Sequence, residues 1–97
     1  MKAVFIAFSQ AYNEEIEDLL MSLGQRGFTK WQEIGGRGSV NGEAHYGCHA
    51  WPAQNHAILT VTEDGLASEI MQKLRETDRE NPKLGLRAWT LPVDESL

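Results

Sequence analysis

Two strongly apolar runs, at residues 3–8 and 57–61, constrain the fold of this chain more than any other feature. The first is unbroken, and the second contains one polar residue, Thr60. An apolar run of this length is typical of a central strand that is covered on both faces of a sheet. Each run is followed by a segment in which apolar residues recur at helical spacing. The sequence therefore predicts two strand–helix units that share one core.

The two helices have recognisable boundaries. The first is predicted to begin at Asn13, because an asparagine side chain can cap the free amide groups of a first turn. Its apolar stripe consists of Ile16, Leu19, Leu20 and Leu23. The second is predicted to begin at Thr62 or Asp64 and to end before Pro82, because proline lacks an amide hydrogen and restricts the residue before it.

Two further strands are predicted at residues 28–34 and 86–91, where β-forming residues stand among polar ones. The order of elements is then βαββαβ, the ferredoxin-like arrangement of the α+β class: a four-stranded antiparallel sheet with both helices on one face. The first and third strands are central in this arrangement, and they are the two most apolar runs. We expect one domain over residues 1–97, with a loose tail at about 93–97.

The face of the sheet opposite the helices is expected to be apolar. The first strand is apolar at every position, and Trp31 and Trp89 lie on the two outer strands. Such a face is commonly covered by another chain, so we expect an oligomer. The alternative is that both tryptophans pack under the helices or under a long loop.

The charge distribution excludes several classes of partner. The formal net charge is -5 and there is no run of lysine or arginine, which disfavours nucleic acid and anionic membrane surfaces. No apolar segment approaches the roughly 18 residues that a membrane span requires, so no membrane insertion is expected. The single cysteine cannot form an internal disulfide, and we expect a cytoplasmic protein.

The segment at about residues 35–56 is expected to form a long loop between the second and third strands. Residues 35–55 contain five of the nine glycines, two of the three histidines and the only cysteine. Connections beyond about 12–15 residues are uncommon in compact domains and are usually functional or disordered. We therefore expect function to reside in this segment.

The start of the long segment is a candidate anion site. Gly36, Arg37 and Gly38 allow a close approach of the backbone, and the guanidinium of Arg37 can bind phosphate or carboxylate. The alternative is that these glycines only permit a sharp exit from the second strand.

The middle of the segment is a candidate metal site. His45, Cys48 and His49 supply imidazole and thiolate ligands that Zn or Cu accepts. The alternative is that these histidines lie in solvent. Cys48 next to His49 is also a nominal nucleophile–base pair, but no third group orients it, and we expect no enzymatic activity.

With this topology and this loop, the chain resembles the PII-like signalling proteins, relatives of nitrogen regulatory protein PII. The order of elements agrees over nearly the whole length. The local matches are Gly36 and Arg37 at the start of the loop, Glu43 and Gly47 within it, and Glu63 and Asp64 at the start of the second helix.

The resemblance implies a compact homotrimer whose sheets line the centre, and adenine nucleotides that bind in clefts between subunits. The ligand-binding residues that it carries over are Gly36, Arg37, Gly38, Gly85 and Arg87. It also implies that the long loop controls a partner protein, such as a transporter or an enzyme, and that no cofactor is required. The Gly-Asp-Gly-Lys-like turn of PII proteins is replaced at residues 82–87 by a segment with one glycine, so a monophosphate, a diphosphate or another anion is equally open.

A second trimeric family, the CutA-like proteins, shares the ferredoxin-like arrangement and is linked to divalent metals. The group formed by His45, Cys48 and His49 keeps this alternative open.

Overall fold

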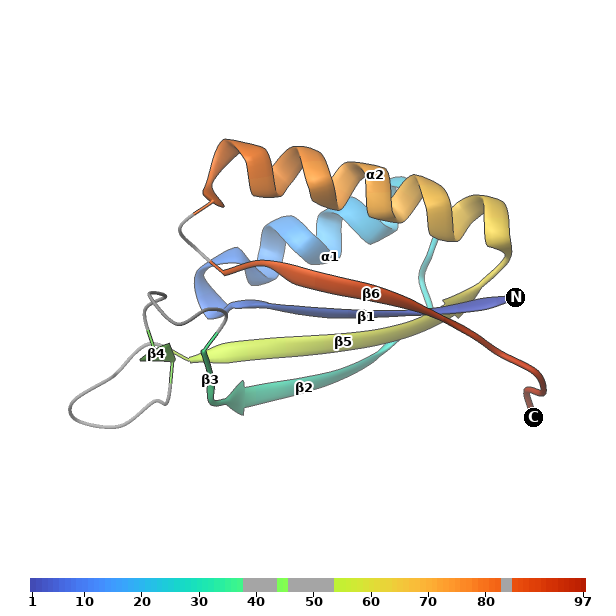
Figure 1. Cartoon of the computed structure of the whole chain (residues 1–97), viewed down its shortest axis with the longest axis horizontal. Coiled ribbons are helices and arrows are strands. Elements are labelled where there is room, and N and C mark those ends of the chain that lie inside the picture. Colours follow the sequence, from blue (N-terminus) through green and yellow to red (C-terminus); the bar gives the residue numbers. More distant parts are fainter. Residues whose placement is uncertain (38–43, 46–53, 83–84) are drawn as a thin grey trace.

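The computed structural model describes residues 1–37, 44–45, 54–82 and 85–97. A four-stranded antiparallel sheet runs through the molecule, and its strands are β1 (Lys2–Ser9), β2 (Thr29–Ile34), β5 (Asn55–Thr62) and β6 (Arg87–Pro92). The order across the sheet is β2-β5-β1-β6 (Figure 1), so the two apolar strands are central. The predicted ferredoxin-like fold is confirmed.

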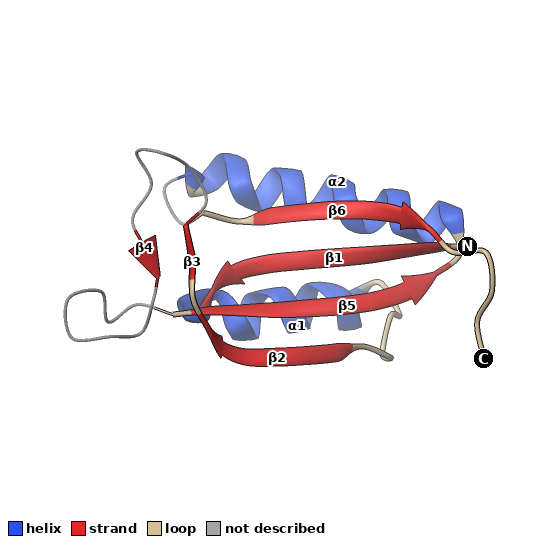
Figure 2. Cartoon of the chain, turned by 60° about the horizontal axis from the view of Figure 1, so that its bottom comes forward, coloured by secondary structure: helices blue, strands red, loops and turns tan. Residues whose placement is uncertain are grey.

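Both helices cover the same face of this sheet (Figure 2). They are α1 (Asn13–Ser22) and α2 (Asp64–Glu80), and a short 3-10 helix, η1 (Gln10–Tyr12), leads into α1. Among the described residues, no helix combines the length and the apolar character that crossing a membrane requires.

The predicted cap of the first helix was wrong. Helical turns begin earlier than expected, because the Ser9 hydroxyl accepts a hydrogen bond from the Ala11 amide at 3.4 Å and starts η1. Asn13 is therefore already helical, and it makes no capping bond. Its side chain is free to bind groups on the sheet instead.

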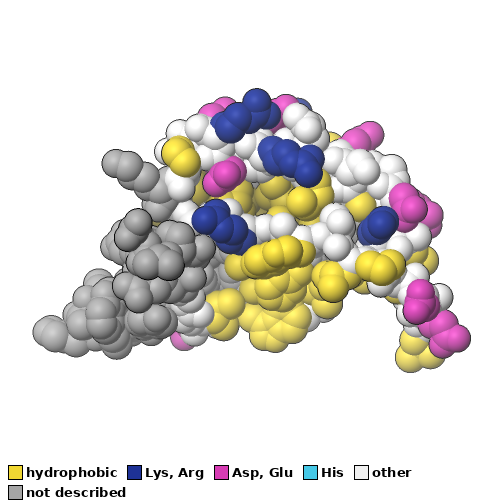
Figure 3. Space-filling view, viewed as in Figure 1, with side chains coloured by type: hydrophobic (Ala, Val, Ile, Leu, Met, Phe, Trp, Pro, Cys, Tyr) yellow, Lys and Arg dark blue, Asp and Glu magenta, His cyan; other side chains and the backbone are white. Residues whose placement is uncertain are grey.

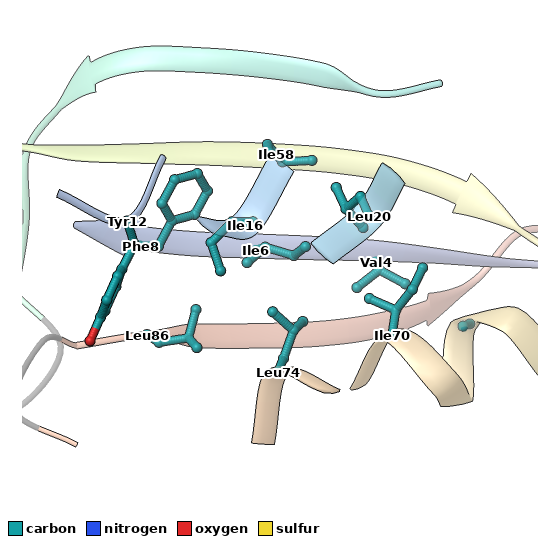
Figure 4. Packing of buried hydrophobic residues seen from close by; sticks show 11 residues of the cluster. Val4, Ile6, Phe8, Tyr12, Ile16, Leu20, Ile58, Ile70, Leu74 and Leu86 are labelled. Carbon is teal, nitrogen blue, oxygen red and sulfur yellow. The ribbon is translucent and has the colours of Figure 1, made fainter. Parts of the chain in front are cut away.

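The core lies between the sheet and the two helices (Figure 4). Alternate residues of β1 point toward the helices, and Val4, Ile6 and Phe8 are completely buried there. The other large buried side chains come from α1, β5 and α2: Ile16, Leu20, Ile58, Ile70 and Leu74. This alternation is the expected result of a two-residue repeat with one face on the core.

The second strand ends in an irregularity. Trp31 pairs with Ala57 and Ile34 pairs with Asn55, so β2 has one more residue than β5 over this stretch, which is a β-bulge. Glu33 lies within the bulge with φ of 58°, a left-handed conformation that residues with a side chain rarely adopt. A bulge of this kind bends the strand and increases its local twist.

The chain then forms a second, small sheet that the sequence did not predict. Strand β3 (Gly36–Arg37) pairs with β4 (Ala44–His45) in antiparallel register. These residues belong to the segment that was expected to be a loop from about 35 to 56. A short self-paired sheet satisfies backbone groups there without needing an apolar sequence pattern.

The sheet face opposite the helices is exposed and aromatic. The Phe5 ring centroid lies 6.2 Å from that of Trp31 and 6.0 Å from that of Trp89. Trp31 is 44% exposed and Trp89 is 52% exposed, so the alternative that they pack under the helices is wrong. Hydrophobic side chains gather below β6 in the space-filling view (Figure 3). We call this surface, which also includes Val61 and Leu91, the open face.

Candidate functional site

The register of the sheet brings several predicted site residues to one end of the molecule. Arg87 pairs with Ala7, and Asn55 pairs with Ser9 at the same end of β1. Gly36 lies against Asn55, since a β-carbon added to Gly36 would stand 2.6 Å from the Asn55 side-chain nitrogen. Strand β3 and the start of β6 therefore lie at the same end of the sheet (Figure 1).

Both ends of the long segment are attached to this end of the sheet. At the first end, the missing β-carbon of Gly36 allows its backbone to approach Asn55 closely. At the other end, the Gln10 amide donates a hydrogen bond to the Gln54 carbonyl at 2.9 Å. The segment is thus anchored to β5 and to η1 at its base.

The turn into β6 supplies the other predicted residues. Gly85 has φ of 71°, which glycine adopts without strain and which brings the chain from α2 back to the sheet. Arg87 is exposed, and its guanidinium donates a hydrogen bond to the Leu86 carbonyl at 2.8 Å. Its other donors are available to a bound anion.

A groove of about 310 Å³ lies beside this turn, between α2 and β6. Met71, Leu74, Leu86 and Ala88 give it an apolar floor. Arg75 and Asp78 line it from α2, and Arg87 lines it from β6. It continues along α2 into a second hollow of about 250 Å³ that shares Met71 and Arg75.

Two buried polar side-chain atoms have no hydrogen-bond partner among the described residues: the Tyr12 hydroxyl and Oδ1 of Asp78, the second of which belongs to a residue that lines the groove. The Tyr12 side chain runs from η1 toward the chain entering β6, beside Leu86 (Figure 4). Burial, with smaller contributions from Glu15, Glu80 and Asp78, raises the pKa of Tyr12. The phenol is therefore neutral at physiological pH and can donate a hydrogen bond.

A polar network joins α1 to the sheet on the opposite side of the core. Lys30 on β2 donates to the Asn13 side-chain oxygen and to Glu17, both at 2.9 Å. The Asn13 oxygen also lies 3.0 Å from Nδ1 of His56 on β5, so this nitrogen is the donor. The bond from Lys30 lowers the pKa of Glu17. Burial and, to a smaller extent, Lys30 lower the pKa of His56.

Sequence reasoning missed both the groove and this network. The groove depends on how α2 lies beside β6, and no local pattern signals that arrangement. For the network, the only signal was the spacing of Asn13 and Glu17, which places them on one helix face. From the sequence, Asn13 was predicted to cap the first helix instead.

Several predicted residues lie outside what the structure describes. Gly38, Cys48 and His49 are not among the described residues, and for Arg37 and His45 only the backbone positions in β3 and β4 are described. Within the described ranges, no group of three or more His, Cys, Asp or Glu residues is placed to hold a metal ion. The metal site at His45, Cys48 and His49 stays a prediction.

The fold, with a long segment attached at one end of the sheet, defines a class. This class is the small ferredoxin-like domains that carry a long insertion between the second and third strands of the main sheet. The family model for nitrogen regulatory protein P-II matches residues 1–96. This chain therefore belongs to the P-II family.

Solved structures of the same fold agree with this assignment. A PII-like signaling protein from Thermus thermophilus is 23% identical, with a TM-score of 0.67 over 95% of this chain and 84% of the other. CPII from Thiomonas intermedia, a nitrogen regulatory PII-like protein, was solved bound to ADP and bicarbonate; it is 18% identical, with a TM-score of 0.72 over 97% of this chain and 88% of the other.

A further structure of CPII holds ADP, AMP and bicarbonate. It is 18% identical to this chain, with a TM-score of 0.69, and covers 99% of this chain and 94% of the other. No curated protein matches this chain.

Proposed function

We propose that this member of the P-II family is a non-enzymatic regulatory protein whose effector is an adenine nucleotide or another small anion. The family assignment supports a signalling role. The relative CPII, which has the same fold, binds ADP, AMP and bicarbonate. The observation that carries the proposal is the placement of Gly36 and Arg87 at the same end of the sheet.

The effector site that we propose consists of Gly36, Arg37 and Gly38 at the base of the long segment and Gly85 and Arg87 at the turn into β6. Glycines at both places allow backbone amides to approach an anion, and arginine binds phosphate or carboxylate with paired hydrogen bonds. In the homotrimer that we propose, these sites lie in clefts between subunits.

The open face supports this trimeric assembly. Phe5, Trp31 and Trp89, from three of the four strands, form a row of aromatic rings across the sheet, and apolar surface of this kind is stabilised by contact with another chain. A second and a third copy of this chain would cover it.

The output that we propose is control of a partner protein, a transporter or an enzyme, through residues 35–56. The base of this segment is attached to β5 and η1 through Gly36 and Gln54. An effector bound at the base contacts the residues where the segment begins. Effector binding therefore shifts the conformations that the segment adopts.

Isothermal titration calorimetry with AMP, ADP and ATP, each with and without bicarbonate, tests the proposal. We expect saturable binding of at least one nucleotide, and binding about tenfold to a hundredfold weaker in Arg87→Ala, because a hydrogen bond to a charged group is lost. Arg26→Ala is the matched control. Arg26 is exposed and follows Gln25, which binds Thr60 at the opposite end of the sheet.

Two results would contradict the proposal. One is the absence of binding heat with every nucleotide and with bicarbonate. The other is binding that Arg87→Ala and Arg26→Ala leave equally unchanged. The cytoplasmic location and the CutA-like metal alternative stay predictions from the sequence.

A further inference from the structure

The groove between α2 and β6 has the composition of a small-molecule site. Its floor is apolar, at Met71, Leu74 and Ala88, while charged side chains line it from both elements. Figure 3 faces this side of the molecule and shows basic and acidic side chains bordering hydrophobic ones between α2 and β6. An apolar hollow with a few convergent polar groups is the usual form of a ligand site.

A buried atom without a partner points to a ligand at this place. Asp78 lines the groove, and its buried Oδ1 has no hydrogen-bond partner in the described part of the chain. Leaving such groups unpaired costs about 1–3 kcal/mol each, so buried polar groups are normally satisfied by protein, water or ligand.

The two arginines that line the groove form no salt bridge with other described residues. Arg75 forms no ion pair or hydrogen bond with any described residue, and the salt bridges of the described residues involve neither Arg75 nor Arg87. The groove therefore presents two guanidinium groups, which can bind negatively charged groups of a ligand. It also presents one carboxylate, which can bind a positively charged group.

We propose that this groove binds a free α-amino acid with an apolar side chain. Its carboxylate lies between Arg75 and Arg87, its ammonium group donates to Oδ1 of Asp78, and its side chain covers Met71, Leu74 and Ala88.

Other small molecules fit this arrangement less well. A simple anion would satisfy the two arginines and leave the Asp78 oxygen unpaired. A simple amine would satisfy Asp78 and leave both arginines unpaired. A zwitterion that carries an apolar group satisfies the charges and covers the floor in one molecule.

Titration of the ¹⁵N-labelled protein with L-leucine, followed by NMR, tests the proposal. We expect saturable shifts of the α2 and β6 amide signals. Two analogues separate the charged contacts: 4-methylpentanoate lacks the amine, and L-leucinamide lacks the carboxylate. Each is expected to bind about tenfold or more weakly than L-leucine, because each loses a charge-assisted hydrogen bond.

Two variants and a control identify the residues involved. Arg75→Gln and Asp78→Asn are each expected to weaken L-leucine binding by about tenfold or more. Lys73→Gln removes the same charge as Arg75→Gln, but Lys73 is exposed on α2 and pairs with Glu76, so it is expected to bind L-leucine normally. The amide spectrum of each variant shows whether it is folded.

The proposal is overturned if L-leucine causes no saturable shifts, if the two analogues bind as well as L-leucine, or if Arg75→Gln and Asp78→Asn bind L-leucine like the control. It does not depend on the nucleotide proposal. Arg75 and Asp78 are absent from the proposed nucleotide site, so L-leucine binding without ADP binding, or the reverse, would separate the two.

Discussion

At the scale of single residues, Asn13 and His56 form the contact that brings α1 onto the strand leaving the long segment. The Asn13 oxygen accepts from Lys30 and lies 3.0 Å from His56 Nδ1, and the His56 ring packs edge-on against Phe8, with centroids 5.9 Å apart. His56 is thus half-buried between a charged neighbour and the core. This position makes its protonation unfavourable in the folded state.

The stability of the protein is expected to fall on acidification through this histidine. Burial, followed by Lys30, lowers the pKa of His56 below its ordinary value of 6.5, against a smaller opposing effect of Glu17 and Glu33. The unfolded chain therefore binds the proton more readily than the folded one, and the stabilisation present above pH 6.5 is lost as the pH falls toward the folded pKa. Urea denaturation of wild type and His56→Gln at several pH values measures this difference.

The expected result is that the difference in unfolding free energy between wild type and His56→Gln shrinks between pH 7.5 and pH 5. A difference that stays constant or grows on acidification would contradict the assignment. Glu17 affects the free energy of unfolding at lower pH. Its pKa is lowered mainly by the bond from Lys30, so its stabilisation is present above about pH 4.5 and is lost below it.

At the scale of elements, α1 ends in a glycine-dependent motif. The amide of Gly24 donates to the Met21 carbonyl at 3.0 Å and that of Gln25 to the Leu20 carbonyl at 2.9 Å, the pattern of a Schellman cap. Gly24 has φ of 83°, which a residue with a β-carbon adopts only at a cost. Gly65, in contrast, lies inside α2 with open space around it.

Replacing these two glycines by alanine is expected to have opposite effects. Gly24→Ala lowers the free energy of unfolding by about 1 kcal/mol, because the left-handed conformation becomes strained. Gly65→Ala raises it by about 0.5–1 kcal/mol, because alanine favours the helix. Thermal or urea unfolding of both variants is the measurement. If both substitutions change the free energy of unfolding in the same direction, the backbone conformations at the two positions do not differ as described.

The sequence predicted the elements whose signal is local and periodic. The apolar runs gave β1 and β5, and the helical spacing gave α1 and α2 with nearly correct limits. The cap at Asn13 was wrong because Ser9 starts a 3-10 turn earlier. Strands β3 and β4 were missed because two-residue strands carry no periodic pattern.

The candidate site was only partly predictable for a related reason. Gly85, which the family resemblance carried over as a ligand-binding residue, has a positive φ, and the register brings Gly36 and Arg87 to one end of the sheet. The groove depends on how α2 lies beside β6. Such tertiary contacts leave no mark in a local window.

At the scale of the whole molecule, the proposed assembly depends on the open face. Trp89→Lys places a charge on this face, on the edge strand β6 and beside Phe5. A single chain tolerates it, because Trp89 is exposed there. In an assembly the charge is buried, which weakens association by about a hundredfold or more. Sedimentation analysis is expected to show smaller particles for Trp89→Lys than for wild type.

Met21→Lys is the matched control for this variant. Met21 is 50% exposed but lies on α1, on the other side of the sheet. It is expected to sediment like wild type. If Trp89→Lys keeps the wild-type assembly, or if Met21→Lys dissociates it equally, the open face is not the interface.

Native mass spectrometry of the protein with and without ADP tests the central claim most directly, because one spectrum gives both the number of chains and the number of bound nucleotides. A P-II family regulator with sites between subunits is expected to appear as a trimer, and to add up to three ADP molecules in discrete steps. A monomer that binds no ADP at any concentration would contradict both the assembly and the effector that we propose.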